Sequence, residues 1–266
     1  MLLRNILEEI PIVADFYRYH WVFTRRPNAY RGVYNSFDEA LKAVPQGKSG
    51  GYSQPEINQS SSASRLTSSY EIGDFNSLDY PVIFWLKSLF NDSNSVFDLG
   101  GNVGLAYYAY QNYLQYPDNL SWLVCEIPEI VKAGTEIAIK KNINNLHFTS
   151  EYSQADGYDI LLTCGALQYI EPNLPQLIKS FNEKPKHILT NHVPFCDNKS
   201  YITLQNLIYT FCPYKIQNKN EFICDLNNLG YELIDTWEIE RNCIIPFHAE
   251  HFVSAYYGFY FRLKNH

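Results

Sequence analysis

A glycine-rich turn between an apolar strand and a helix is the feature of this sequence best suited to chemistry. The stretch reads Ser95-Val96-Phe97-Asp98-Leu99-Gly100-Gly101-Asn102-Val103-Gly104. Glycines adopt positive φ angles and let a ligand approach the backbone, and the start of the following helix offers free N–H groups to a carboxylate or phosphate. The pattern predicts a nucleotide-type binding loop, although a glycine-rich turn by itself is a weak signal.

An acidic residue at the end of the next predicted strand strengthens this interpretation. The run Leu123-Val124-Cys125-Glu126 ends in a side chain that can accept hydrogen bonds from both hydroxyls of a ribose. The alternative for Glu126, taken singly, is an exposed acid that merely ends a strand. Because it follows the glycine turn in the expected order, we predict that Glu126 binds the ribose of a cofactor.

Two features favour S-adenosylmethionine over a dinucleotide as that cofactor. The motif has the form Asp-x-Gly-Gly-x-x-Gly, with Asp98 at a position where dinucleotide sites usually continue the apolar strand. No second Rossmann half is predicted downstream, and no P-loop Lys-Ser or Lys-Thr is present. We therefore expect S-adenosylmethionine.

The sequence resembles class I S-adenosylmethionine-dependent methyltransferases, and within them it is similar to a bacterial family often found with surface-polysaccharide genes. The resemblance extends over nearly the whole chain. Besides the glycine turn, it rests on Tyr30-Arg31-Gly32-Val33-Tyr34-Asn35-Ser36-Phe37-Asp38-Glu39-Ala40, Trp122-Leu123-Val124-Cys125-Glu126-Ile127-Pro128, Cys164-Gly165-Ala166-Leu167-Gln168-Tyr169-Ile170 and Leu189-Thr190-Asn191-His192-Val193-Pro194-Phe195.

The resemblance assigns roles to residues at the expected cofactor site. Those implied to hold the methionine end are Asp98, Gly100, Gly101, Asn102 and Gly104, with Cys164 and Gly165 nearby. Those implied at the adenine are Ile127, packed on the ring, and Ser150 and Glu151, near its amine. The broad class most often has glycine where this chain has Asn102, whereas the narrower family also lacks that glycine.

Methyl transfer to a hydroxyl needs a base, whereas a phosphate or carboxylate acceptor needs none. His192 ends a predicted strand at the sheet edge where open α/β folds bind ligands, and it is our candidate catalytic base; the alternative is a structural histidine. Expected contacts to the acceptor or the entrance of the site come from Tyr70, Tyr80, Tyr108, His248 and His251. Arg65 is a candidate partner for the cofactor carboxylate.

No metal is predicted. His248 and His251 have the spacing of half a metal site, without further ligands in the pattern. The six cysteines form no C-x-x-C pair, and most lie in apolar runs, which favours a core role.

The elements around these residues alternate between strands and helices, which predicts a doubly wound, mostly parallel α/β sheet. From the class, the resemblance implies seven strands in the order 3-2-1-4-5-7-6, with strand 7 antiparallel. The expected strands are 95–99, 120–126, 146–149, 158–164, 187–193, 231–239 and 253–263, and the expected helices are 79–90, 103–115, 128–142, 173–182 and 219–228.

An N-terminal helical and irregular extension, residues 1–75, is expected before a methyltransferase domain at 76–266. Ser36 and Glu39 form a predicted capping box within it. The Ser-rich stretch 59–70 is interpreted as a flexible connection, or alternatively as a lid over the cofactor.

Composition excludes some classes of function. With 46% apolar and 18% charged residues the chain can bury a core, and a net charge of −7 argues against a nucleic-acid surface. The acidic start and the absence of 18 consecutive apolar residues argue against a signal peptide or membrane insertion, so we expect a cytoplasmic location.

The sequence therefore predicts methyl transfer from S-adenosylmethionine to an oxygen of a small polar acceptor, favouring a sugar, a nucleotide-linked sugar or a surface-glycan modification (capsule or LPS). Two alternatives stay open: N- or O-methylation of another small metabolite, and a non-catalytic binding protein on a cofactor fold. A dehydrogenase is the remaining possibility. The acceptor atom and the oligomeric state do not follow from the sequence.

Overall fold

The computed structural model describes residues 11–51, 73–208 and 210–264, which form two compact units. The first unit draws on residues 1–59, 194–219 and 240–256, and the second on 60–193, 220–239 and 257–266. Arg65, Tyr70 and the whole Ser-rich stretch 59–70 lie outside the described residues. The expected boundary after residue 75 stays a prediction.

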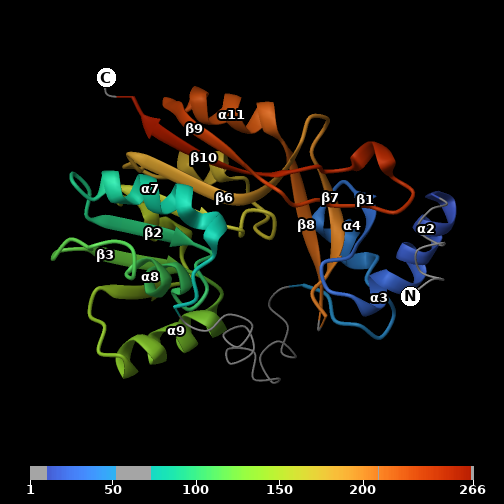
Figure 1. Ribbon diagram of the computed structural model, residues 1–266, viewed down its shortest axis with the longest axis horizontal. Coiled ribbons are helices and arrows are strands. Elements are labelled where there is room, and N and C mark those ends of the chain that lie inside the picture. The colour runs from blue at the N-terminus through green and yellow to red at the C-terminus, as the bar shows by residue number, and fades with distance from the viewer. Residues whose placement is uncertain (1–10, 52–72, 209, 265–266) are drawn as a thin grey trace. The chain divides into compact units, whose positions relative to one another are not determined.

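The second unit is built on a largely parallel sheet (Figure 1). Strands β2 (Ser95–Leu99), β3 (Ser121–Cys125), β4 (Leu146–Thr149), β5 (Ile160–Cys164) and β6 (His187–Cys196) pair in parallel in the order β4-β3-β2-β5-β6. Parallel strands share one carboxyl edge. The ends of all five strands therefore bring residues that are distant in sequence to the same side of the sheet.

Two closing strands complete this sheet beyond β6. Strand β10 (Tyr256–Leu263) pairs with β6 and with β9 (Tyr231–Ile239). The Leu263 N–H donates to the carbonyl of Lys186 at 2.8 Å, and the Lys264 N–H to that of Gly230 at 3.0 Å. The end of β10 thus lies beside the starts of β6 and β9, so β10 is antiparallel to both. The strand order expected from the resemblance is confirmed.

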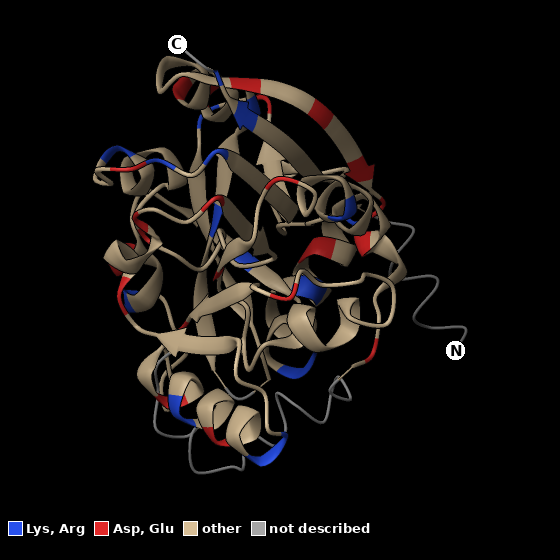
Figure 2. Ribbon diagram, turned by 90° about the vertical axis from the view of Figure 1, so that its left-hand side faces the viewer, with Lys and Arg blue, Asp and Glu red and all other residues tan. Residues whose placement is uncertain are grey.

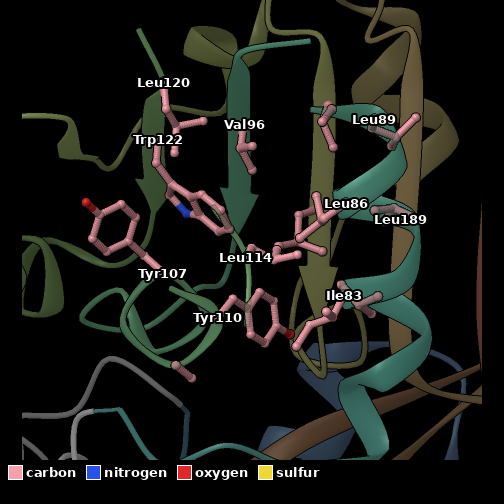
Figure 3. Close-up of a cluster of buried hydrophobic side chains, with 14 of the residues drawn as sticks. Ile83, Leu86, Leu89, Val96, Tyr107, Tyr110, Leu114, Leu120, Trp122 and Leu189 are labelled. Carbon is pink, nitrogen blue, oxygen red and sulfur yellow. The ribbon is translucent and has the colours of Figure 1, made fainter. Parts of the chain in front are cut away.

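Helix α7 (Tyr80–Leu89) covers part of this sheet with an aliphatic face (Figure 3). Its buried side chains pack against Val96, Ile160, Leu162 and Leu189 from β2, β5 and β6; they are Val82, Ile83, Leu86 and Leu89. Each such side chain contributes about 1.5–3 kcal/mol when fully buried. The packing fixes the start of α7 relative to the ends of the strands.

The remaining helices of the second unit follow the strands in turn. They are α8 (Leu105–Tyr110), α9 (Pro128–Lys140), α10 (Leu174–Lys179) and α11 (Lys219–Asn228), of which the last begins at the final residue of the first unit. Helix α9 approaches β4 closely because Gly134 has no side chain, and a Cβ there would collide with the ring of Phe148.

The exposed strand β9 carries acidic residues along its length (Figure 2). Among the described strands it pairs only with β10, and Glu232, Asp235 and Glu238 lie on it. Charges on an edge strand discourage pairing with another chain. No helix within residues 11–51, 73–208 and 210–264 is long and apolar enough to cross a membrane.

The first unit contains a small sheet of β1 (Tyr30–Tyr34), β7 (Tyr201–Asn206) and β8 (Phe211–Asn218). Both β1 and β8 pair antiparallel with β7, and the last two residues of β6 pair in parallel with β8. Helices α2 (Pro11–Tyr17), α3 (Phe23–Arg25) and α4 (Phe37–Lys42) and a π-helix (Arg18–Val22) complete its N-terminal part. One of its buried hydrophobic clusters consists of Phe23, Ala40, Ile202, Leu204 and Phe211.

Several expected elements are wrong in extent or were missed. The strand expected at 187–193 continues to Cys196, and β1, β7 and β8 were not predicted. Both faces of β7 and β8 are buried, and Pro213 interrupts the pattern of β8. The alternating runs Ile202-Thr203-Leu204-Gln205 and Tyr214-Lys215-Ile216-Gln217 are a strand signal that the sequence analysis did not use. The helix expected at 103–115 is only Leu105–Tyr110, because Gly104 precedes it with φ +90°.

Only one of the two hydrogen bonds of the predicted capping box is present. The Glu39 N–H donates to the Ser36 hydroxyl at 3.1 Å, which caps α4. The Glu39 carboxylate does not return to Ser36; it accepts from the Asn35 N–H at 2.9 Å.

Candidate functional site

The turn after β2 can adopt its conformation only with glycine at two positions. Gly100 has φ +76° and Gly104 has φ +90°, in the left-handed region that side chains disfavour. The Gly100 N–H donates to the Cys125 carbonyl at 2.9 Å, which holds the turn against the end of β3. A Cβ on Gly100 would collide with that of Ala166, so the loop after β5 closely approaches this turn.

Asp98 is buried beneath the turn. Its carboxyl is 1% exposed and accepts a hydrogen bond from Trp122 Nε1 at 3.1 Å. A Cβ on Gly101 would collide with the Asp98 carboxyl, so this acid lies directly against the loop. Burial raises the pKa of Asp98 to about 7, opposed by the Trp122 hydrogen bond. Asp98 supports the glycine loop from below.

Glu126 connects the turn to the start of α9. Its Oε1 accepts from the Asn102 N–H at 3.2 Å, and its Oε2 from the Ile127 N–H at 3.0 Å. Burial raises the pKa of Glu126, and the two backbone N–H groups oppose that shift. Each carboxylate oxygen keeps a second lone pair, so the oriented carboxylate can still accept from two ligand hydroxyls.

Asn102 takes the conformation that glycine would otherwise supply. Its φ is +55°, and its side-chain Oδ1 accepts from the Val103 N–H at 2.8 Å. Asparagine tolerates this region because its short amide bonds the local backbone. The departure from the usual glycine therefore preserves the shape of the turn.

The loop after β5 lies against Asn191 and His192 of β6 and also beside the glycine turn after β2. Gly165 has φ +74°, its N–H donates to the Asn191 carbonyl at 2.8 Å, and its carbonyl accepts from Gln168 Nε2 at 2.7 Å. A Cβ on Gly165 would lie 3.6 Å from the Cβ of His192. Cys164, just before it, lies beside the Tyr110 hydroxyl, and burial raises its pKa well above the usual range.

His192 forms a pair with Asp79, which the sequence analysis missed. His192 Nε2 lies 3.0 Å from Asp79 Oδ1, and both side chains are about one-seventh exposed, at 13% and 14%. The same oxygen accepts from Asn191 Nδ2 at 2.8 Å. Asn191 is itself oriented by Trp237 Nε1, which donates to its Oδ1 at 2.8 Å. His192 Nε2 also lies 3.3 Å from Nδ2 of Asn76. Of the two neutral tautomers, the one with Nε2–H directed at the Asp79 carboxylate leaves Nδ1 to accept a proton.

The sequence around Asp79 shows only the pattern of a helix N-cap. Asp79 precedes α7 at the N-cap position, where an aspartate normally caps the helix, yet its carboxylate makes no capping bond. Its partners are 112 and 113 residues away. The sequence pattern of an N-cap gives no indication of such distant partners.

The other predicted residues are distributed over both units. Ser150 and Glu151 follow β4, where the Glu126 N–H donates to the Thr149 carbonyl at 2.9 Å, so they lie near the end of β3. Tyr80 is exposed, with its ring 4.8 Å from that of Phe75. Tyr108 is buried in the core of the second unit. The Tyr108 ring faces core side chains. Its expected contact with an acceptor stays a prediction.

His248 and His251 belong to the first unit, together with Glu250. Their expected contact with an acceptor also stays a prediction.

Comparison with known proteins identifies a fold. No family model matches the chain, and no curated protein matches it. The solved structures that match include a magnesium protoporphyrin IX methyltransferase from Synechocystis PCC 6803 with bound SAH, at 11% identity and a TM-score of 0.51, covering 79% of this chain and 97% of that one. They also include the mitomycin 7-O-methyltransferase MmcR, at 10% identity and a TM-score of 0.50, covering 86% of this chain and 66% of that one. The chain thus shares the fold of class I S-adenosylmethionine-dependent methyltransferases.

Proposed function

We propose that this protein transfers a methyl group from S-adenosylmethionine to an oxygen of a small polar acceptor. The observation that carries the proposal is the contiguous arrangement at the carboxyl edge of the sheet. The glycine turn after β2, Glu126 after β3, Gly165 after β5 and His192 on β6 are linked by backbone hydrogen bonds or direct approach.

The residues around the glycine turn suit a ligand that has an adenosyl group and a charged amino-acid end. Positive φ angles at Gly100 and Gly104 shape the turn between β2 and α8, where the ligand would contact the backbone. Glu126 offers two preoriented acceptors for the ribose hydroxyls. Asp98 is a buried acid under the loop, and the sulfonium and ammonium of a bound ligand would favour its charged form against the burial that raises its pKa to about 7.

In this proposal the sulfonium supplies an activated methyl, and the protein aligns the acceptor and removes a proton. The acceptor oxygen forms the new C–O bond as the C–S bond breaks, and the sulfur keeps that electron pair. The hydroxyl proton passes to Nδ1 of His192. Asp79 accepts from Nε2–H and stabilises the imidazolium that results.

For the acceptor we favour a sugar, a nucleotide-linked sugar or a modification of a surface glycan (capsule or LPS). This choice rests on the resemblance to a family associated with surface-polysaccharide genes. The net charge of −7 supports a small acceptor over a nucleic acid.

The first test is cofactor binding by calorimetry on the full chain. We expect binding of S-adenosylmethionine and of SAH at micromolar levels. Glu126→Ala should weaken binding by about 1.5–3 kcal/mol, since it removes a charged acceptor. The control is Glu129→Ala, an exposed acid three residues further along, which should leave the affinity unchanged. Heat with NAD but none with S-adenosylmethionine would rule out the proposal.

The second test identifies the product. Labelled S-adenosylmethionine is offered with a panel of nucleotide-linked sugars, and the products are analysed by mass spectrometry. A sugar methyl ether supports the full proposal. An N-methyl product from another metabolite panel would overturn the oxygen acceptor, and binding without turnover on any acceptor would instead indicate a non-catalytic protein.

A further inference from the structure

The segment His248-Ala249-Glu250-His251 assembles three side chains of the kind that hold transition metals. From the sequence, the two histidines look like half a site without other ligands, and no metal is predicted. The structure adds Glu250: one ligand atom from each of His248, Glu250 and His251 lies within 4.8 Å of the others. All three residues belong to the first unit.

The distances between the ligand atoms match the dimensions of a metal site. His248 Nδ1 lies 3.5 Å from Glu250 Oε1, and His251 Nε2 lies 3.6 Å from the same oxygen. Ligands at 2.0–2.2 Å around a tetrahedral ion are separated by about 3.4 Å. The two histidine nitrogens lie within 4.8 Å of each other, so rotation of the side chains that brings them to this spacing would place all three atoms on one ion.

The backbone that carries these ligands is held at several points. The short 3-10 helix Ala249–His251 is closed by the His251 N–H, which donates to the His248 carbonyl at 3.0 Å. Tyr201 donates from its hydroxyl to the His251 carbonyl at 2.7 Å, and its ring packs edge-on against the His251 ring at 4.4 Å.

The base of this loop is also closed. Cys243 and Val253 form an isolated antiparallel bridge with hydrogen bonds of 3.0 and 3.1 Å. The ligands therefore lie on a loop whose ends and middle are tied to the unit, which lowers the entropy lost when an ion binds.

We propose that His248, Glu250 and His251 bind a divalent transition-metal ion of the zinc type. Two imidazoles and one carboxylate are a nitrogen and oxygen set that suits Zn²⁺, Co²⁺ or Ni²⁺ and disfavours Mg²⁺ and Ca²⁺, which prefer oxygen ligands. Three protein ligands leave at least one coordination position for water or another oxygen ligand. The competing interpretation is a surface carboxylate flanked by two histidines with no ion.

The test is zinc binding to the full chain, produced without a histidine tag and freed of metal with a chelator. Calorimetry with zinc should give one site per chain, and magnesium under the same conditions should give no heat. His248→Ala, His251→Ala and Glu250→Gln should each weaken zinc binding at least tenfold, because each removes one of three ligands. His147→Ala, an exposed histidine on β4, is the matched control and should bind zinc as the parent protein does.

Thermal unfolding gives a second readout, since an ion bound to the folded chain raises the midpoint. Zinc should raise the midpoint of the parent protein and of His147→Ala, and should raise that of Glu250→Gln less. Glu250 is exposed and Gln has its shape, so this variant should fold. Equal zinc affinity in the parent and all three ligand variants, or no binding at all, would overturn the proposal.

Discussion

At the scale of single residues, the carboxylate of Asp79 determines what His192 can do. It receives Nε2 of His192 at 3.0 Å and Nδ2 of Asn191 at 2.8 Å, so the imidazole has one preferred orientation. His192 itself has φ +57°, an uncommon conformation for a residue with a side chain. His192 lies inside β6, and such strain is a feature of functional sites when the surrounding structure maintains it.

If His192 is the base, its loss should reduce turnover far more than binding. We expect His192→Ala to lower kcat by about 10² to 10⁴, the usual contribution of a positioned base, with SAH affinity unchanged. Asp79→Asn should lower kcat less and leave KM near the parent value, because the base remains but its orientation is weakened. Steady-state kinetics and SAH calorimetry measure both effects.

The control for Asp79→Asn is Asp92→Asn, an exposed acid just after α7, which should behave as the parent protein. An equal loss of SAH binding and rate in His192→Ala would make His192 a structural residue. Full activity would mean that another group is the base or that the acceptor is an anion that needs none.

At the scale of elements, the junction of β2 and α8 depends on how closely two loops approach. Gly100 has φ +76°, and a Cβ there would collide with Ala166 of the loop after β5. Gly47 has nearly the same angle, φ +74°, with no atom within 4 Å of the position a Cβ would take. The two glycines thus separate the cost of the backbone conformation from the cost of the contact.

Gly47→Ala should cost only the left-handed conformation, about 1–2 kcal/mol of unfolding free energy. Gly100→Ala should cost more, since the clash forces the loop at Ala166 or the turn itself to move. It should also abolish SAH binding if the turn holds the cofactor. Chemical denaturation gives the unfolding free energies, and equal losses for the two variants would contradict the close contact.

At the scale of the whole molecule, the two units are interleaved along the chain. Strand β1, near the N-terminus, pairs with β7, about 170 residues later, and Phe23 packs with Leu204 and Phe211. The first unit is therefore assembled from residues 1–59, which precede the second unit in the chain, and from residues 194–219 and 240–256, which interrupt it. The N-terminal segment forms one hydrophobic cluster together with β7 and β8.

Deletion of residues 1–75 should consequently unfold the first unit. The fragment 76–266 retains β7 and β8 but lacks β1 and the side chains of Phe23 and Ala40. We expect it either to be insoluble or to lose hydrogen-exchange protection over Tyr201–Asn206 while Ser95–Leu99 remains protected. A soluble fragment with full protection at Tyr201–Asn206 would show that residues 76–266 fold independently.

The sequence by itself was sufficient for the features that depend on neighbouring residues. Val96–Gly104 shows a buried strand, a turn that requires glycine and a helix start within ten residues, and Glu126 ends the next strand. Local propensity and periodicity decide such elements. The parallel direction of most strands follows from the alternation of strands and helices along the chain. The strands at 95–99, 146–149 and 231–239 agree with the structure at both ends.

The tertiary structure alone decided what depends on distant contacts. Strands β7 and β8 alternate apolar and polar residues over 202–205 and 214–217, as half-buried strands do, yet the structure buries both faces, including Thr203, Gln205 and Gln217. Asp79 meets His192 only because α7 packs on β5 and β6. A side chain's sequence neighbours determine its local conformation, whereas its partners across the fold depend on how whole elements pack, which no single stretch of sequence encodes.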